Sequence, residues 1–167
     1  MRFSKMGIQF NPLKVYLLDL IRKKMNYIEQ KETLKHFTQV KHRDFSAGFW
    51  LEHAANASAL NAEMGPTRKK FKSKEAKERL ELELPFLKLK KVTDSKVVRL
   101  HQVLWFFDHG HVYIPKGEEK KWIDYKNELA AFPAGKNDDQ VDCTSLCLRI
   151  MDEKLTNIRR AESLSEF

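Results

Sequence analysis

Residues 14–22 form the stretch that most restricts the fold of this chain. The run Lys-Val-Tyr-Leu-Leu-Asp-Leu-Ile-Arg follows Asn11-Pro12 and is rich in residues that favour β-strands. Apolar side chains occupy successive positions, and not only alternate ones, which is typical of a strand inside a sheet that is covered on both faces. The sequence therefore predicts a layered protein in which helices pack against a sheet.

The rest of the chain alternates strand-like with helix-like runs. We expect strands at 45–52, 82–92 and 111–115 and helices at 28–41, 54–64, 97–107, 120–132 and 141–155. Pro85 favours an edge position for the 82–92 strand, and Asp94 is the expected N-cap of the 97–107 helix. This alternation predicts an α/β fold with a mixed sheet flanked by helices. We assign residues 1–158 to one domain and 159–167 to a polar C-terminal tail.

The charge of the chain indicates the kind of partner that it binds. Its 167 residues carry a net charge of +8, with a pI near 9.4. Such a basic protein favours a polyanion, most simply nucleic acid. No apolar run approaches the roughly 20 residues of a transmembrane helix, so we expect no membrane partner. Cys143 and Cys147 give no disulfide framework and no four-ligand zinc site, and they are expected to be reduced, in the cytoplasm.

The densest basic run spans residues 67–74. A solvated loop is the more common outcome for such a run, but the interleaved Phe71 makes a loop that follows a phosphate backbone an alternative. The candidate phosphate-binding residues of this run are Arg68, Lys69, Lys70, Lys72 and Lys74.

Three carboxylates fall within five residues directly after the turn-forming Pro133 and Gly135. Asp138, Asp139 and Asp142 are spaced so that they lie close together at the start of a helix. One interpretation is a helix start, because aspartate is favoured at the N-cap and in the first turn. The other is a site for a hard divalent ion such as Mg²⁺, which takes carboxylate ligands. The local sequence favours the two equally.

Glu52 is the second candidate metal ligand. It ends the expected 45–52 strand, and two-metal nucleases need carboxylates from distant parts of the chain at one edge of a sheet. A first-turn acid ahead of the 54–64 helix is the alternative interpretation.

The order of these motifs resembles the C-terminal nuclease domain of the terminase large subunit, the DNA-packaging motor of tailed phages. The matching segments cover most of residues 14–150. They are Val15-Tyr-Leu-Leu-Asp-Leu-Ile-Arg22, Leu51-Glu-His-Ala-Ala-Asn-Ala-Ser-Ala-Leu60, Ser95-Lys-Val-Val-Arg99, Gly110-His-Val-Tyr-Ile-Pro115 and Phe132-Pro-Ala-Gly-Lys-Asn-Asp-Asp-Gln-Val-Asp142. The last of these motifs is fairly specific; the others are weak alone but occur in the family's order.

The resemblance implies an RNase H-like fold that cuts double-stranded DNA with Mg²⁺ or Mn²⁺ in the cytoplasm of a bacterial host. It places Glu52 at the family's second acidic position and the three aspartates at its third, and it puts Lys96 and Arg99 on the basic pair near the DNA. The remaining terminase large-subunit chain, the portal and the small terminase subunit are the implied protein partners.

This sequence also departs from the family pattern. The family's first catalytic Asp lies on a strand that should precede the 15–22 strand, and residues 1–13 contain no Asp or Glu. Asp19 matches a commonplace position and not the catalytic one. The ATPase half of the family is missing. We therefore expect a domain that lacks its first strand and either has incomplete metal ligation or is an inactive fragment.

Two rival functions stay open at this level. The chain could be a non-catalytic basic DNA-binding or packaging-partner module, whose carboxylates serve only as helix caps. It could also be another RNase H-like nuclease, such as a junction resolvase, which would prefer branched over linear DNA.

Overall fold

The computed structural model describes residues 2–41, 48–52, 55–65, 87–117 and 119–165. The backbone groups into two compact units, residues 1–23 with 94–167 and residues 24–93. The first unit contains the three aspartates, and the second contains Glu52. Each unit is described separately below.

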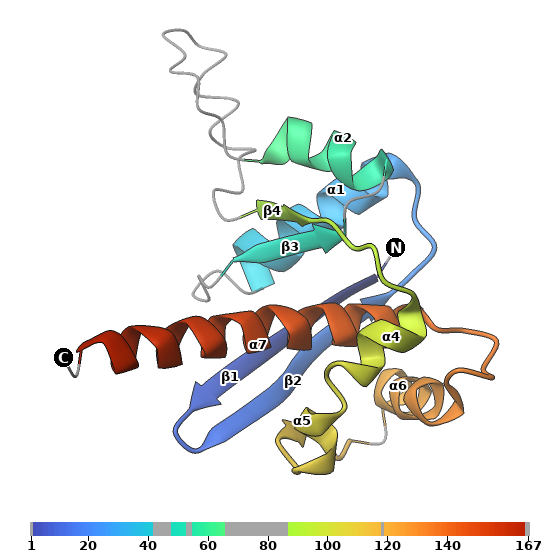
Figure 1. Cartoon of the computed structure of the whole chain (residues 1–167). Coiled ribbons are helices and arrows are strands. Elements are labelled where there is room, and N and C mark those ends of the chain that lie inside the picture. The colour runs from blue at the N-terminus through green and yellow to red at the C-terminus, as the bar shows by residue number, and fades with distance from the viewer. Residues whose placement is uncertain (1, 42–47, 53–54, 66–86, 118, 166–167) are drawn as a thin grey trace, which may run out of the picture. The chain divides into compact units, whose positions relative to one another are not determined.

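The first unit is built on a three-stranded sheet in the order β1-β2-β5 (Figure 1). β1 (Arg2–Phe10) pairs antiparallel with β2 (Leu13–Arg22), and β2 pairs in parallel with β5 (Val112–Tyr113). The expected strands at 14–22 and 111–115 are thus present, the second only two residues long. β1 was not expected, although the alternation of Met6, Ile8 and Phe10 with Gly7 and Gln9 is a strand signal.

A β-bulge explains the apolar run in β2. Met6 pairs with Leu17 and Lys5 with Asp19, so Leu18 is the extra residue of the longer strand. Leu17 and Leu20 are both buried, although they are three residues apart, whereas Leu18 is 42% exposed. The sequence predicted that both faces of this strand are covered, but the side chain of Leu18 is exposed.

The described residues of the first unit also form helices that pack with this sheet (Figure 1). They are α4 (Lys96–His101), α5 (Trp105–Asp108), α6 (Lys120–Ala131) and α7 (Asp139–Ser165). The long α7 packs on β1, α4 and α6. The expected polar tail at 159–167 is helical as far as Ser165, with exposed side chains at residues 156–163.

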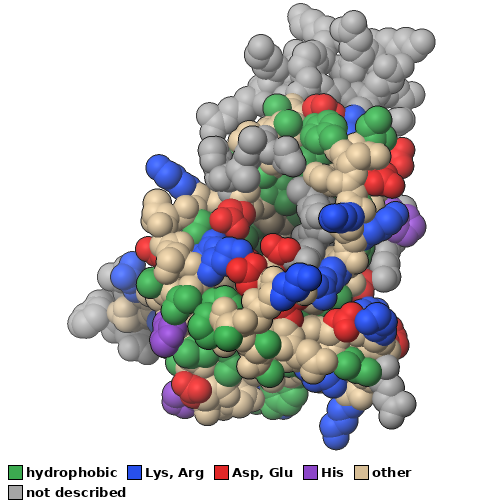
Figure 2. Space-filling model, turned by 90° about the vertical axis from the view of Figure 1, so that its right-hand side faces the viewer, with side chains coloured by type: hydrophobic (Ala, Val, Ile, Leu, Met, Phe, Trp, Pro, Cys, Tyr) green, Lys and Arg blue, Asp and Glu red, His purple; other side chains and the backbone are tan. Residues whose placement is uncertain are grey.

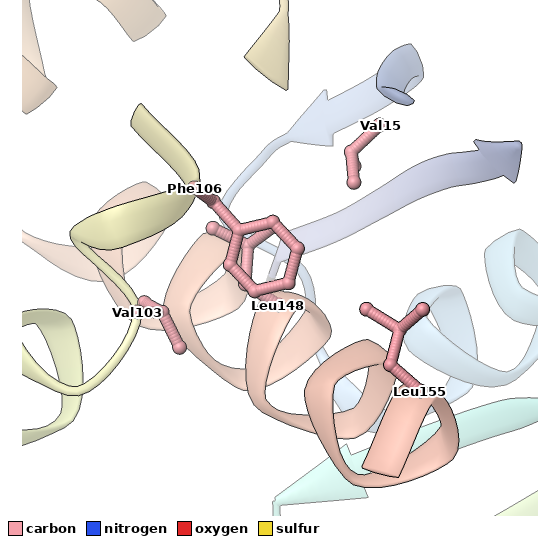
Figure 3. Packing of buried hydrophobic residues seen from close by; sticks show 5 residues of the cluster. All are labelled: Val15, Val103, Phe106, Leu148 and Leu155. Carbon is pink, nitrogen blue, oxygen red and sulfur yellow. The ribbon is translucent and has the colours of Figure 1, made fainter. Parts of the chain in front are cut away.

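Two apolar clusters hold this unit together. One contains Val15 of β2, Val103 and Phe106 from the α4–α5 region, and Leu148 and Leu155 of α7 (Figure 3). The other joins Leu17 and Leu20 to Trp122 and Tyr125 of α6, with Leu129 packed against it. The predicted apolar face of the 120–132 helix is confirmed.

The N-cap of α4 differs from the prediction. The Ser95 hydroxyl accepts a hydrogen bond from the backbone N–H of Val98 at 3.3 Å, which satisfies a free donor of the first turn. Asp94 is not the cap. Its carboxylate lies 3.2 Å from the guanidinium of Arg149, so it joins the start of α4 to α7.

Among its described residues, the second unit contains a two-stranded parallel sheet and helical segments on either side of β3 in the sequence. β3 (Phe49–Glu52) pairs with β4 (Leu87–Lys90). α1 (Tyr27–Lys35), which begins with an Asn26 capping box, continues as the π-helical segment His36–Lys41, and α2 (Ala55–Met64) follows β3. Glu63 of α2 accepts hydrogen bonds from Tyr27 at 2.9 Å and Lys31 at 2.7 Å of α1.

The described elements form a mixed α/β structure with small sheets and flanking helices. The finer prediction, an RNase H-like sheet without its first strand, stays a prediction. Among the described residues, no helix combines the length and the apolar character needed to cross a membrane.

Candidate metal centre

The three aspartates lie together at the start of α7. Asp138 precedes the helix, and its backbone carbonyl accepts a hydrogen bond from the N–H of Asp142 at 3.0 Å. One carboxylate oxygen from each of Asp138, Asp139 and Asp142 lies within 4.8 Å of the other two. Asp139 is exposed, and the other two are half-buried. The sequence prediction that these side chains converge is therefore confirmed, and the cluster has the donor atoms that a hard divalent cation needs.

Lys96 of α4 reaches into this cluster. Its Nζ lies 2.8 Å from Oδ1 of Asp138 and 2.8 Å from Oδ2 of Asp142, so one ammonium group bridges two carboxylates. Burial by itself lowers the pKa of Lys96, but its hydrogen bonds to Asp138 and Asp142 together outweigh this and raise the pKa above the ordinary lysine value. The lysine is therefore fully charged at neutral pH.

Arg99, one turn further along α4, contacts the same cluster. Its NH2 donates to Oδ1 of Asp142 at 2.6 Å, and the two side chains are 4% and 14% exposed. A charge-assisted hydrogen bond between such buried partners is short and strong. It holds the carboxylate of Asp142 in place, whereas 42% of the Lys96 side chain is exposed to solvent.

The formal charges of these five side chains do not cancel. Three aspartates contribute −3 and the two cations +2, which leaves −1. Figure 2 shows acidic and basic side chains side by side on the surface of the molecule. The arrangement can bind a divalent cation if Lys96 withdraws, and it can equally persist as an ion-pair network.

A buried carboxylate fixes the start of α7 from the other side. Glu128 of α6 accepts a hydrogen bond from the backbone N–H of Gln140 at 2.6 Å and another from its side-chain Nε2 at 2.8 Å. Arg22 of β2 lies 3.5 Å from the same carboxylate. Glu128 thereby satisfies a free donor in the first turn of α7, a task that usually falls to a local N-cap side chain.

Tyr125 adds a third anchor to the first turns of α7. Its hydroxyl lies 2.7 Å from the Oγ1 of Thr144, which in turn donates to the carbonyl of Gln140 at 2.7 Å. Burial raises the pKa of Tyr125 well above its ordinary value, and it also raises that of the Cys147 thiol. These groups are therefore neutral at physiological pH. Cys143 and Cys147 are not joined by a disulfide.

The other predicted site residues lie elsewhere. Glu52 is exposed at the end of β3, in register with Lys90, and belongs to the second unit. Its approach to the aspartates stays a prediction. The basic run with Arg68, Lys69, Lys70, Lys72 and Lys74 lies outside the described residues. Asp19 is buried in β2, where its carboxylate accepts from the N–H of Leu20 and lies 3.6 Å from Lys121.

Sequence reasoning placed Lys96 and Arg99 near DNA and did not anticipate their contact with the aspartates. It also missed Glu128, which determines where α7 begins. A Lys-x-x-Arg spacing puts both cations on one helix face, but their partners lie more than forty residues away. Comparison of the chain with protein-family models, with curated proteins and with solved structures gives no match.

Proposed function

We propose that the aspartate cluster of α7 is a divalent-metal site and that the chain acts as a metal-dependent DNA endonuclease domain of the packaging-terminase type. The observation that carries this proposal is the convergence of three carboxylates, with ligand oxygens within 4.8 Å, at a helix start. The net charge of +8 supports DNA as the substrate. The terminase assignment itself rests on the resemblance of the sequence motifs.

In this proposal Asp138, Asp139 and Asp142 hold Mg²⁺ or Mn²⁺, with Glu52 as a further ligand. A bound ion of this kind activates water and stabilises the leaving oxygen of a phosphodiester. Arg99 positions Asp142 through its short hydrogen bond. Lys96 leaves the carboxylates when the ion binds, and its ammonium is then available to a DNA phosphate.

Metal binding is the most direct test. We expect Mn²⁺ to bind in a calorimetric titration of the full chain and the Asp139→Asn variant to lose this binding, because a ligand charge is removed. Asp124→Asn is the matched control, since Asp124 is an aspartate of α6 that pairs with Lys120 outside the cluster. Equal Mn²⁺ binding by both variants would contradict the site, and loss of binding in Glu52→Gln would support the convergence of the two units' carboxylates.

Cleavage is the second test. We expect weak or no cleavage of linear duplex DNA with Mn²⁺, because the family's first catalytic aspartate has no counterpart in residues 1–13. Vigorous cleavage that Asp139→Ala abolishes would show that the remaining carboxylates suffice.

The ion pairs favour a second candidate function, a non-catalytic DNA-binding module. Lys96 and Arg99 already satisfy Asp138 and Asp142 without a metal, as caps and structural ion pairs would require. This function predicts DNA binding that responds to salt but not to a chelator or to Asp139→Asn.

Both functions predict nonspecific, salt-dependent DNA binding. Each neutralised phosphate lowers the log affinity by about 0.9 per tenfold rise in salt. Replacing Lys69, Lys70, Lys72 and Lys74 by Gln should weaken binding and flatten this slope on every DNA sequence, as an anisotropy titration across a salt series would show. An unchanged slope would assign the run to a solvated loop.

A further inference from the structure

The face of the β1-β2-β5 sheet opposite its apolar core carries a strip of aromatic and apolar side chains. Paired residues of neighbouring strands share a face, and residues on successive positions alternate between faces. Met6, Ile8 and Val15 point into the core, so Gly7 and Tyr16, which pair with each other, lie on the other face. Tyr113 of β5 pairs with Tyr16 and therefore belongs to the same strip.

The two tyrosines of this strip stack on each other. Their ring centroids are 5.1 Å apart, with an angle of 30° between the planes. Gly7 carries no side chain next to Tyr16, and a Cβ built there would come within 3.1 Å of Cδ1 of Leu18, so Leu18 occupies that space. Leu18, Tyr16 and Tyr113 thus form a continuous surface across the strands.

This surface is accessible at its two ends. Leu18 is 42% exposed and Tyr113 is 43% exposed, and one ring face of Tyr113 is taken by Tyr16. The Nζ of Lys14 lies 5.6 Å from the centroid of the Tyr113 ring. A positive charge therefore lies over a partly exposed aromatic ring, in a chain with a net charge of +8, and a base that stacks on that ring face displaces the ammonium toward its own phosphate.

We propose that this strip binds single-stranded nucleic acid, with an unpaired base stacked on Tyr113 and a phosphate on Lys14. Exposed aromatic rings bind bases without sequence preference because every base has a π-face, and adjacent cations bind the backbone. A base on Tyr113 extends the stack that Tyr16 begins. Paired bases in a duplex are not free to stack in this way, so the site takes unpaired strands in preference to duplex. The inference does not depend on the metal centre.

The experiment is an anisotropy titration of the full chain with a fluorescent oligothymidylate, in the presence of a chelator so that the aspartate cluster binds no metal. Tyr113→Leu removes the ring but keeps apolar bulk, and it should weaken binding roughly tenfold. Tyr113→Phe keeps the ring and should bind like the wild type. Lys14→Gln should lower the salt slope by about 0.7, the value for one phosphate of a single strand.

Phe10→Leu is the matched control. Phe10 is an aromatic residue that is 46% exposed on the same hairpin, but its position in β1 puts it on the core side of the sheet. We expect this variant to bind like the wild type, and an oligonucleotide with 5-iododeoxyuridine to crosslink to Tyr113. Circular dichroism melting of every variant checks that the hairpin folds.

Three outcomes would overturn the proposal. The first is equal affinity of the wild type and a folded Tyr113→Leu variant. The second is equal loss in Phe10→Leu, which would show a general effect on the hairpin. The third is a dimer in sedimentation experiments that Tyr113→Leu dissociates with no change in oligonucleotide affinity, because the strip would then be an interface between copies of the chain.

Discussion

Two different kinds of contact hold the first turn of α7, one buried and one exposed to solvent. On one side Glu128 and Gln140 are buried and joined by two hydrogen bonds, and on the other Lys96 and Asp138 are about 40% exposed and joined by one ion pair. A buried carboxylate that accepts a backbone N–H cannot leave without loss of the helix start. A half-exposed lysine can exchange its partner for water or a cation at little cost. The difference separates an anchor from an adaptable site on one helix turn.

The largest expected effect is on the buried side. Glu128→Ala leaves the Gln140 N–H and the Arg22 guanidinium without their acceptor, and we expect a loss of about 3 kcal/mol in the free energy of unfolding. Urea denaturation measures it. Glu119→Ala is the control, because Glu119 is an exposed acid of the same region that pairs with Lys121 at the surface. If Glu128→Ala lowered the free energy of unfolding as little as Glu119→Ala, the buried contact of Glu128 would not be the stronger anchor of α7.

Arg99 lies between the two extremes. Arg99→Met keeps much of the apolar stem but leaves the half-buried Asp142 without its closest donor, and we expect a loss of about 2 kcal/mol. A double-mutant cycle with Asp142→Asn isolates the interaction. A coupling energy near zero would mean that Arg99 supports the fold by packing alone and does not position Asp142.

The cap of α4 should have a smaller effect. Ser95→Ala removes the acceptor for the Val98 N–H and should cost about 1 kcal/mol, whereas Ser95→Asp should restore most of it. Thermal unfolding compares them. If Ser95→Ala were silent and Asp94→Ala were costly, the cap would lie where the sequence predicted it.

Lys96 should have the smallest effect and the clearest pH dependence. Lys96→Gln should cost about 0.5 kcal/mol at neutral pH, because the pair is half-exposed. The folded state raises the pKa of Lys96, so the pair's contribution is complete below the ordinary lysine range and is lost as the pH rises through the raised value.

Alkaline unfolding curves test this sign. The pKa values of Tyr125 and Cys147 are also raised in the folded state, so these two groups likewise lower the free energy of unfolding as the pH rises. Their effect is present in both proteins, and the difference in stability between wild type and Lys96→Gln therefore reports on Lys96. That difference should shrink at alkaline pH. A difference that grows with pH would contradict the assigned ion pair.

These two sides of α7 differ in how far the sequence could predict them. The three aspartates and the apolar face with Trp122 and Tyr125 are local patterns with helical spacing, and they were predictable. Glu128 was not, because a charged residue in a helix ordinarily lies in solvent and its partner is set by tertiary packing. The Ser95 cap was missed because Asp94 and Ser95 are both good caps, and only the backbone geometry separates them.

The bulge at Leu18 has a consequence for tracing the ancestry of this chain. Without Leu18 the strand would alternate regularly, and the same leucines would still face inward. One residue at this position can therefore be gained or lost between descendants without a change in the packed interior. An alignment with a distant relative that lacks the bulge should place a gap at Leu18. Without that gap, the inward residues of this chain on one side of the bulge are matched to outward residues of the relative.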